Sequence, residues 1–366
     1  MTVQADASQM RRAIARARRA LHRTSPNPRV GCVVVAGGRV VGAGVSAPPG
    51  GPHAEIQALR QAGERARGAD LYVTLEPCAH TGRTPPCADA IISAGVARVF
   101  IGVLDPHPVA RGGAERMRAA GIEVQVGVLA DECAALHAPF LSTVQRGRPW
   151  VLLKAAVTLD GRLATLGGAA RWITGPDARR DGHKLRAWAD AVMVGATTAR
   201  LDDPSLNVRE VRGTDPLRVV ADPDLTLPPT ARLLGPQALV LHAGDADAGR
   251  ARALAETGAR LVAVHRSGRG LDPAAMLQAL AEHGVMSVLV EGGGRLHGSL
   301  LRARLADEAC IYLAPRIIGP GRPLADLPAV EAIGAGLTLD APAWTRLGAD
   351  MRVRGRIVYP APGEEA

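Results

Sequence analysis

Residues 70–87 read DLYVTLEPCAHTGRTPPC, a run that joins an apolar segment to two cysteines separated by eight residues. The apolar part, 70–76, predicts a β-strand. Pro85 and Pro86 favour a new helix beginning at the second cysteine, and we expect that helix to run through Ala94. A strand followed by a loop and a helix is the repeating unit of α/β proteins.

The rest of the N-terminal half repeats this alternation. Apolar residues recur at helical spacing over residues 8–22 and predict a helix there. The pair Gly37-Gly38 between two apolar runs predicts a β-hairpin. We expect a sheet with helices on both faces, complete as a domain by about residue 145. Its further elements are strands at 30–35, 39–45, 97–103 and 122–127, and helices at 53–65 and about 115–120.

A second α/β domain is expected after residue 146. QRGRPW, at 145–150, is polar and contains Gly and Pro, which predicts a linker. The predicted domains are therefore 1–146 and 147–366, and we find no internal repeat in either. Strands of the second domain are expected at 151–157, 191–196, 217–222, 238–243, 260–264, 286–292 and 308–314.

Composition narrows the class of protein. The chain has 366 residues, of which 47% are hydrophobic and 22% charged, as in a globular protein with two domains. No apolar run approaches the ~18 residues that cross a bilayer, and the N-terminus lacks the apolar stretch of a secretory signal. We expect a cytoplasmic protein that does not associate with a membrane. Five cysteines fit a reducing compartment better than a disulfide framework.

A net charge of +9 raises the possibility of a nucleic-acid partner. The sequence argues against it, because the arginines are scattered along the chain and aromatic residues make up only 2%. Lys154 and Lys184 are the only lysines.

His53, Cys78 and Cys87 carry donor atoms of the kind that Zn²⁺ prefers. Three protein ligands are typical of a catalytic zinc with an open position, whereas structural sites usually have four. Cys32 or His80 remains an alternative fourth ligand, although Cys32 lies within an apolar strand pattern that favours a core position.

Glu55 follows the histidine by two residues where a helix is expected to begin. In an opening helical turn, both side chains can approach one cavity. Zinc lowers the pKa of a water molecule to about 7, and a nearby glutamate can take the proton and deliver it to a leaving nitrogen. His-x-Glu upstream of a Pro-Cys segment is the signature of zinc deaminases.

The insert between the two cysteines is longer than the two residues of that signature. We expect it at the mouth of the pocket, where His80, Arg83 and Thr84 can donate hydrogen bonds. With Asn27 and Asp105 it suggests a pocket for a polar, heavily substituted heterocycle.

Long stretches resemble the bifunctional deaminase–reductases of riboflavin biosynthesis. The N-terminal half contributes PNPRVGCVVV, PHAEIQAL, VTLEPCAHTGRTPPCADAIISAGV and DPHP, and the C-terminal half KAAVTLDGRLAT, RWITGPDAR, VEGGGRLHGSLL and IYLAPRIIG. The resemblance implies a cytidine-deaminase-like three-layer α/β/α domain fused to a dihydrofolate-reductase-like α/β domain. It implies deamination of 2,5-diamino-6-ribosylamino-4(3H)-pyrimidinone 5′-phosphate, then reduction of the ribosyl group to ribityl by NADPH.

The resemblance also assigns residues of the second half. Gly292–Gly294 lie between a strand and a helix, where backbone N–H groups can meet phosphate, but His297 breaks the dinucleotide-binding pattern of glycines. Lys154, in an apolar strand, is expected to meet an anion or a reacting oxygen, and we expect it to polarise the ribose. The implied substrate contacts are Arg186, Leu206, Arg209 and Glu291. The implied cofactor contacts are Ala156, Trp172, Thr198, Asp202, Gly293, Gly294, Arg295, Leu296, His297, Gly298 and Ser299.

Four positions depart from the family: Ser46, Thr81, Ala170 and Pro223. The expected partner is a small phosphorylated pyrimidine, and a homo-oligomer is expected for a fused enzyme of this size. One alternative is a zinc deaminase of another nucleobase or of tRNA, with a C-terminal domain for binding. Another is a zinc-stabilised, basic regulator that binds nucleic acid, whose binding would weaken with salt.

Overall fold

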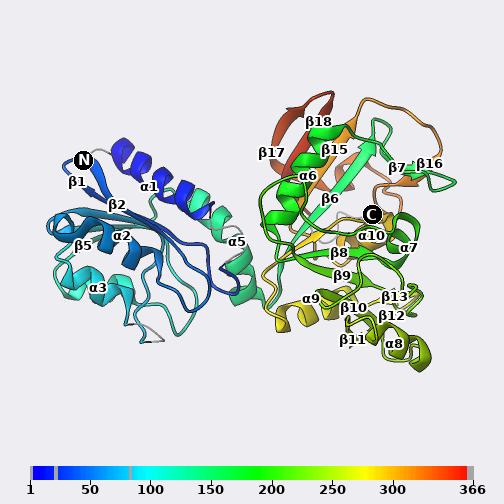
Figure 1. Cartoon of the computed structure of the whole chain (residues 1–366). Helices are drawn as coiled ribbons and strands as arrows, with labels where there is room; N and C mark the ends of the chain where they lie inside the picture. The colour runs from blue at the N-terminus through cyan, green and yellow to red at the C-terminus, as the bar shows by residue number, and fades with distance from the viewer. Residues whose placement is uncertain (1–2, 20–23, 82–84, 361–366) are drawn as a thin grey trace. The chain divides into compact units, whose positions relative to one another are not determined.

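The computed structural model describes residues 3–19, 24–81 and 85–360 (Figure 1). The chain divides into two compact units, Met1–Arg148 and Pro149–Ala366, and each unit is described by itself. Among the described residues, no helix has the length and apolar character that crossing a membrane would require.

The N-terminal unit is built on a five-stranded sheet of order β2-β1-β3-β4-β5. β1 is antiparallel to β2 and β3, whereas β3, β4 and β5 are parallel. β1 and β2 form the predicted hairpin, because Gly37 and Gly38 take the positive φ angles, 56° and 76°, that a tight turn needs. The strands are β1 Gly31–Ala36, β2 Arg39–Val45, β3 Asp70–Leu75, β4 Arg98–Val103 and β5 Glu123–Val126.

Helices cover both faces of this sheet, as predicted (Figure 1). α1 (Val3–Ala17) and α5 (Ala130–Arg146) pack on one face. α2 (Ala54–Ala62), followed by the short helix η1 (Gly63–Ala66), packs on the other, with α3 (Cys87–Ser93) and α4 (Gly113–Ala119) beside it.

Three boundaries differ from those the sequence patterns predict. α1 begins at Val3 instead of residue 8 and ends at Ala17, and residues 20–22 of the expected helix lie outside the described part of the chain. α5 is absent from the predicted elements because Pro139 stands inside it and would normally interrupt a helix. The linker expected at 145–150 is shorter than predicted, since α5 continues to Arg146 and the next strand begins at Trp150, but the boundary between the two units, after Arg148, falls within it.

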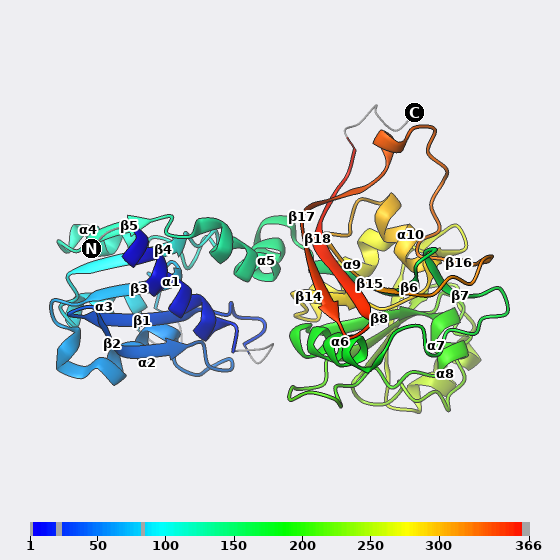
Figure 2. The ribbon, with the colours of Figure 1, turned by 90° about the horizontal axis from the view of Figure 1, so that it is seen from above.

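The C-terminal unit contains a nine-stranded sheet of order β11-β10-β9-β8-β14-β6-β15-β18-β17. Neighbours from β11 to β15 in this order are parallel, and the β17–β18 hairpin continues the sheet antiparallel to β15 (Figure 2). The strands are β6 Trp150–Thr158, β8 Ala191–Gly195, β9 Leu217–Ala221, β10 Ala238–Ala243, β11 Arg260–Val264, β14 Ser287–Val290, β15 Glu308–Ala314, β17 Thr338–Leu347 and β18 Asp350–Val358.

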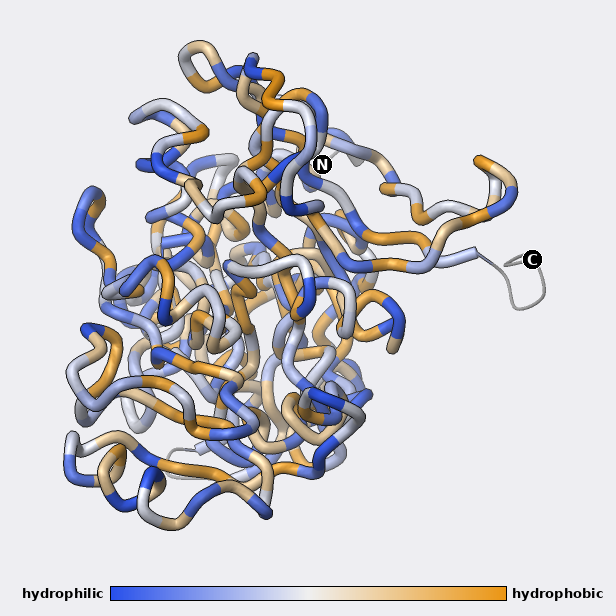
Figure 3. Tube along the Cα trace, turned by 90° about the vertical axis from the view of Figure 1, so that its right-hand side faces the viewer, coloured by the Kyte–Doolittle hydropathy of each residue, from blue (hydrophilic) through white to orange (hydrophobic). Residues whose placement is uncertain are grey.

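The parallel strands are buried on both faces. Apolar segments recur along the chain trace, separated by polar turns (Figure 3). Neighbouring residues such as Leu152 and Leu153 belong to two different core clusters, because successive side chains of a strand point to opposite faces. The helices are α6 Pro176–Trp188, α7 Ala196–Asp202, α8 Ala248–Ala255, α9 Pro273–Glu282, α10 Gly294–Arg302 and the short η2 Ile333–Ala335. Small strand pairs add β7 Arg162–Thr165 with β16 Gly321–Pro323, and β12 Arg266–Ser267 with β13 Gly270–Leu271.

Candidate active sites

Three donor side chains from three elements converge in the N-terminal unit. His53 precedes α2, Cys78 follows the central strand β3 by three residues, and Cys87 is the first residue of α3. His53 Nδ1 lies 3.1 Å from Cys87 Sγ and 3.7 Å from Cys78 Sγ. All three donor atoms lie within 4.8 Å of one another.

This spacing fits a tetrahedral zinc site. Bond lengths of about 2.05 Å to nitrogen and 2.3 Å to sulfur place a nitrogen and a sulfur ligand about 3.6 Å apart, close to the observed separations of 3.1 and 3.7 Å. Among residues 3–19, 24–81 and 85–360, no fourth histidine, cysteine or carboxylate joins the group. Cys32, the alternative ligand, is fully buried in β1, as expected of a core residue.

The three donor groups are linked by hydrogen bonds, and a bound cation would take the place of the shared protons. Hydrogen bonds from the thiol and the backbone N–H of Cys87 lower the pKa of Cys78, against its burial. A hydrogen bond with Cys78 in turn raises the pKa of His53, although burial lowers it. Zinc binds thiolates and a neutral imidazole, so a dication held by all three groups would displace protons from this cluster.

Glu55 lies in the first turn of α2, beside this group, and is buried. Burial raises the pKa of its carboxyl to about 7, while His53 and a hydrogen bond with Cys87 lower it. The opening turn of α2 therefore directs the histidine and the glutamate toward the same thiols, as the His-x-Glu spacing predicts.

The residues expected to line the pocket differ in burial and in hydrogen bonding. The Nδ1 atom of His80 is buried and has no hydrogen-bond partner within the described part of the chain. Asp105 is buried, and burial raises the pKa of its carboxyl, against a hydrogen bond from the His107 N–H. Asn27 lies in the exposed turn before β1. Arg83 and Thr84 lie outside the described residues.

Glu76, a residue that the sequence patterns assign only to a strand, is buried next to the zinc-type donors. Its carboxylate accepts hydrogen bonds from the backbone N–H groups of Asp105, Gly112 and Ala114. These partners lie 29 to 38 residues away in the sequence, so no local pattern marks them.

A second cluster of charged side chains lies at the carboxyl end of the parallel sheet in the C-terminal unit. The register pairs Val290 of β14 with Leu153 of β6, which brings the next residues, Glu291 and Lys154, together. The Lys154 ammonium lies 3.8 Å from a Glu291 oxygen and 5.7 Å from the centre of the Tyr312 ring.

Arg186 of α6 completes this cluster. Its Nε and a terminal nitrogen donate to the two oxygens of Glu291 at 2.6 and 2.8 Å, and another nitrogen donates to the Asn207 carbonyl. Burial would raise the pKa of Glu291, but Arg186 and Lys154 lower it to about 2. The structure thus corrects one expectation, because the bidentate edge of Arg186 holds Glu291 and is not free to grip a phosphate.

Arg209 has the freer guanidinium. It is exposed, and one terminal nitrogen donates to the Asn207 side chain at 3.2 Å. His183, which no sequence pattern marked, lies beside it and accepts the Arg209 backbone N–H at 3.4 Å. The Leu206 side chain is buried in the core, so only its main chain can be offered to a ligand.

The glycine turn after β14 lies against α7. A side chain at Gly293 would come within 3.1 Å of the Thr198 hydroxyl, so the Gly293 backbone and the Thr198 hydroxyl lie side by side. From this turn α10 begins at Gly294 with its N–H groups unpaired inside the helix. The side chain of His297 points away, with Nδ1 3.0 Å from the Leu324 carbonyl and Nε2 3.3 Å from that of Val290. Leu296 and Gly298 are buried as well, and Arg295 and Ser299 lie on the same helix, α10.

The remaining expected cofactor contacts lie on neighbouring elements. Ala156 follows Lys154 by two residues on the same face of β6. Trp172 is exposed, with the Arg179 guanidinium 4.5 Å from its ring centre. Burial raises the pKa of Asp202, although Arg171 and Arg322 lower it.

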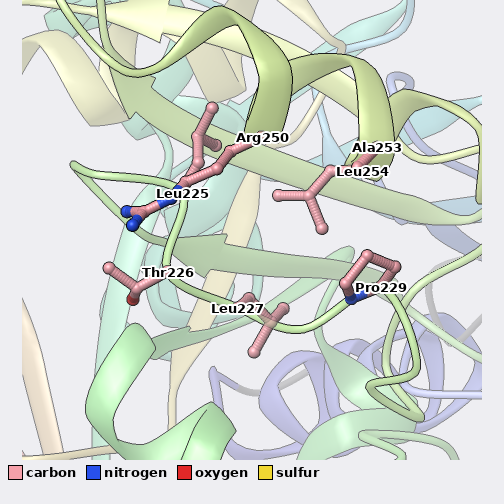
Figure 4. A pocket seen from close by; sticks show the side chains of 7 residues that line it. All are labelled: Leu225, Thr226, Leu227, Pro229, Arg250, Ala253 and Leu254. Carbon is pink, nitrogen blue, oxygen red and sulfur yellow. The ribbon is translucent and has the colours of Figure 1, made fainter.

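A small cavity of about 230 Å³ lies elsewhere in the C-terminal unit (Figure 4). Thr226 and Arg250 are its polar residues, and each is already engaged, with Arg200 and Asp222 in one case and the Asp224 carbonyl in the other. We assign it no ligand. Its other walls are Leu225, Leu227, Pro229, Ala253 and Leu254.

Two family models match this chain. The model described as the cytidine and deoxycytidylate deaminase zinc-binding region matches residues 3–103. The model of the RibD C-terminal domain matches residues 149–353.

Known proteins resemble the whole chain. The riboflavin biosynthesis protein RibD of Aquifex aeolicus is 41% identical over 94% of this chain and 97% of its own length. The RibD protein of Escherichia coli is 40% identical over 88% of this chain and 92% of its own. The solved structure of Acinetobacter baumannii RibD has a TM-score of 0.88 at 37% identity and covers 98% of this chain and 100% of its own. A Thermotoga maritima structure, titled a diaminohydroxyphosphoribosylaminopyrimidine deaminase/5-amino-6-(5-phosphoribosylamino)uracil reductase, has a TM-score of 0.84 at 33% identity, covering 97% and 99%. This chain belongs to the RibD family of riboflavin biosynthesis proteins, which join a deaminase to a reductase.

Proposed function

We propose that residues 1–146 deaminate 2,5-diamino-6-ribosylamino-4(3H)-pyrimidinone 5′-phosphate and that residues 147–366 reduce the ribosyl group of the product with NADPH. The observation that carries the first step is the convergence of three zinc-type donors with the buried Glu55. The expected homo-oligomer and the absence of a nucleic-acid partner stay predictions.

For the deamination, His53, Cys78 and Cys87 are the residues that would hold a zinc ion. Bound zinc would supply a Lewis acid that lowers the pKa of water to about 7. Glu55 takes a proton from the attacking water on a carboxylate oxygen and delivers it to the exocyclic nitrogen, which leaves as ammonia while the ring carbon gains the oxygen. His80 and Asp105 orient the ring beside it.

For the reduction, the backbone of Gly293 and Gly294 and the Thr198 hydroxyl are the groups that would hold the cofactor phosphates. Bound NADPH would supply a hydride to C1′ of the ribosyl group. Lys154 Nζ delivers a proton to the ring oxygen as the bond between that oxygen and C1′ breaks, which opens the sugar to ribityl. Glu291 holds the ammonium in place, and Arg209 binds the substrate phosphate.

A coupled assay tests both steps in one sample. The diaminopyrimidinone ribotide is added with NADPH, and ammonia and the absorbance at 340 nm are followed together. We expect one ammonia per NADPH oxidised, with ammonia appearing first. A chelator should stop ammonia release from the first substrate but not NADPH oxidation when the deaminated product is supplied directly. NADPH oxidation that does not depend on deaminated product would contradict the proposed order.

A further inference from the structure

A buried carboxylate joins the metal-donor segment to a distant loop of the N-terminal unit. Glu76 lies two residues before Cys78, and one of its oxygens accepts the N–H groups of Gly112 and Ala114 at 3.1 and 2.9 Å. The other oxygen accepts the Asp105 N–H at 3.1 Å. One side chain thus holds both ends of loop 105–112.

Backbone contacts reinforce this junction. A side chain at Gly113 would lie 1.8 Å from the Pro77 carbonyl, so the first residue of α4 packs directly on the residue between Glu76 and Cys78. The Ala79 N–H donates to the Ala110 carbonyl at 3.0 Å, one residue beyond the cysteine. The loop and the start of α4 are therefore held on both sides of Cys78, by the Glu76 side chain before it and by the backbone hydrogen bond of Ala79 after it.

The loop carries Asp105, whose own carboxylate accepts the His107 N–H at 2.8 Å. Because Glu76 fixes the backbone of Asp105 relative to Cys78, it sets where the Asp105 side chain stands beside the donor group. We propose that Glu76 is a positioning residue of the deaminase site, which acts on substrate affinity through Asp105. This inference rests on the proposed function of that site.

Glu76→Gln tests the inference with almost no change of shape. A glutamine has one acceptor oxygen and one NH₂ group. When the glutamine oxygen faces Gly112 and Ala114, it still accepts the hydrogen bonds from both of their N–H groups. The NH₂ group then faces the Asp105 N–H, and two donors cannot form a hydrogen bond. The change therefore releases Asp105 and leaves the start of α4 held. We expect KM for the ribotide to rise at least about tenfold, which is 1.4 kcal/mol, with kcat within about threefold of wild type.

Two internal controls separate positioning from general damage. Reductase activity on the deaminated product reports on the other unit of the same chain and should not change. Asp70→Asn removes another buried acid, at the opposite end of β3, which accepts two 2.7 Å hydrogen bonds from Arg98. We expect this control to lower the melting temperature of the N-terminal unit without changing KM.

Hydrogen exchange on the intact chain gives a second measurement. In wild type, the amides of Asp105, Gly112 and Ala114 should all be protected, and in Glu76→Gln only that of Asp105 should become fast. An unchanged KM, or a loss of zinc and kcat with KM unaltered, would overturn the inference, as would fast exchange of Asp105 in wild type. A wild-type enzyme that releases no ammonia from the ribotide would instead contradict the proposed function, and the exchange result would still stand.

Discussion

The two units each bury a glutamate at the centre of a site, and the two carboxyls have opposite properties. Burial raises the pKa of Glu55 to about 7 in the N-terminal unit. In the C-terminal unit, Arg186 and Lys154 hold the pKa of Glu291 at about 2 in spite of its burial. The difference comes from the neighbours, because Glu55 faces a histidine and two cysteines whereas Glu291 is paired with Lys154 and Arg186.

This contrast distinguishes two ways to build a polar site. The cluster around Glu291 contains its own cations, so its charges are compensated by the folded chain alone. The cluster around Glu55 consists of groups that bind a cation and has no lysine or arginine in its donor set. The charges of the first cluster are balanced within the chain, whereas the donors of the second are of the kind that would be balanced by a bound metal ion.

Removing a metal donor should have the largest effect and should affect one unit only. We expect Cys87→Ser to lower deaminase activity by at least about 1,000-fold, because without the metal the pKa of water returns toward about 15.7. Reductase activity on the deaminated product should stay within about twofold. The measurements are zinc per chain by mass spectrometry and the two activities.

Cys133→Ala is the matched control, since this cysteine is equally buried but belongs to the core beside Gly102. It should keep zinc and both activities. Full deaminase activity in a zinc-free Cys87→Ser protein would remove the metal from the account.

Removing a cation from the other cluster should destabilise its unit. Arg186→Met leaves Glu291 buried with Lys154, at 3.8 Å, as its remaining ion-pair partner, and we expect a loss of about 3–5 kcal/mol in the free energy of unfolding. All four tryptophans lie in the C-terminal unit, at 150, 172, 188 and 344, so their fluorescence reports on that unit alone.

The double variant Arg186→Met with Glu291→Gln removes both charges of this pair. It should recover part of the lost stability, because no buried carboxylate is then left without its arginine. A double variant that is less stable by the sum of the two single losses would mean that the pair contributes little as a pair.

The sequence predicts those parts of the molecule in which local pattern and tertiary structure agree. The seven parallel strands of the second sheet are apolar runs because both faces are buried, and each was expected close to its observed position. Neither β17 nor β18 is among the predicted strands; the residues of β17 are mostly exposed and Pro342 interrupts them. β17 and β18 form an edge hairpin, in which no strict alternation of apolar residues is required.

The same distinction applies to the sites. The zinc-type donors are recognisable because their residue types are chemically specific, even though three elements supply them. The pairing of Arg186 with Glu291 spans 105 residues and follows from the register of β14 and the position of α6, which no local pattern encodes. Glu76 was missed for the same reason, since its partners are backbone N–H groups of a distant loop.

A smaller effect is expected from the reacting cation of the reductase site. Lys154→Met should lower the kcat of the reductase by about 100-fold, the lower end of the range for a lost general acid, with deaminase activity unchanged. The chain provides its own control in Lys184, the only other lysine, which is exposed and three residues from Asp181. Lys184→Met should leave kcat unaltered, and an active Lys154→Met enzyme would exclude Lys154 as the proton donor.

The smallest expected effect is the loss of folding stability in acid, which should also distinguish the two glutamates. A folded-state pKa of about 2 for Glu291, below its ordinary 4.5, means that its ionised form stabilises the fold above pH 4.5. That stability is lost as the pH falls from 4.5 toward 2, because the unfolded chain binds the proton first. The full contribution is about 3 kcal/mol, of which about 2 kcal/mol should be gone at pH 3.

Urea unfolding followed by tryptophan fluorescence at pH 6 and pH 3 measures this term. The free energy of unfolding of wild type should fall by about 2 kcal/mol more than that of Glu291→Gln, which cannot titrate at this position. Subtracting the change measured for the variant removes the contribution of other groups. These include His183 and His297, because burial lowers their pKa values and their protonation in acid also destabilises the fold. An equal loss in both proteins would mean that Arg186 and Lys154 do not keep Glu291 ionised, and the two buried glutamates would then differ in their neighbours but not in their charge.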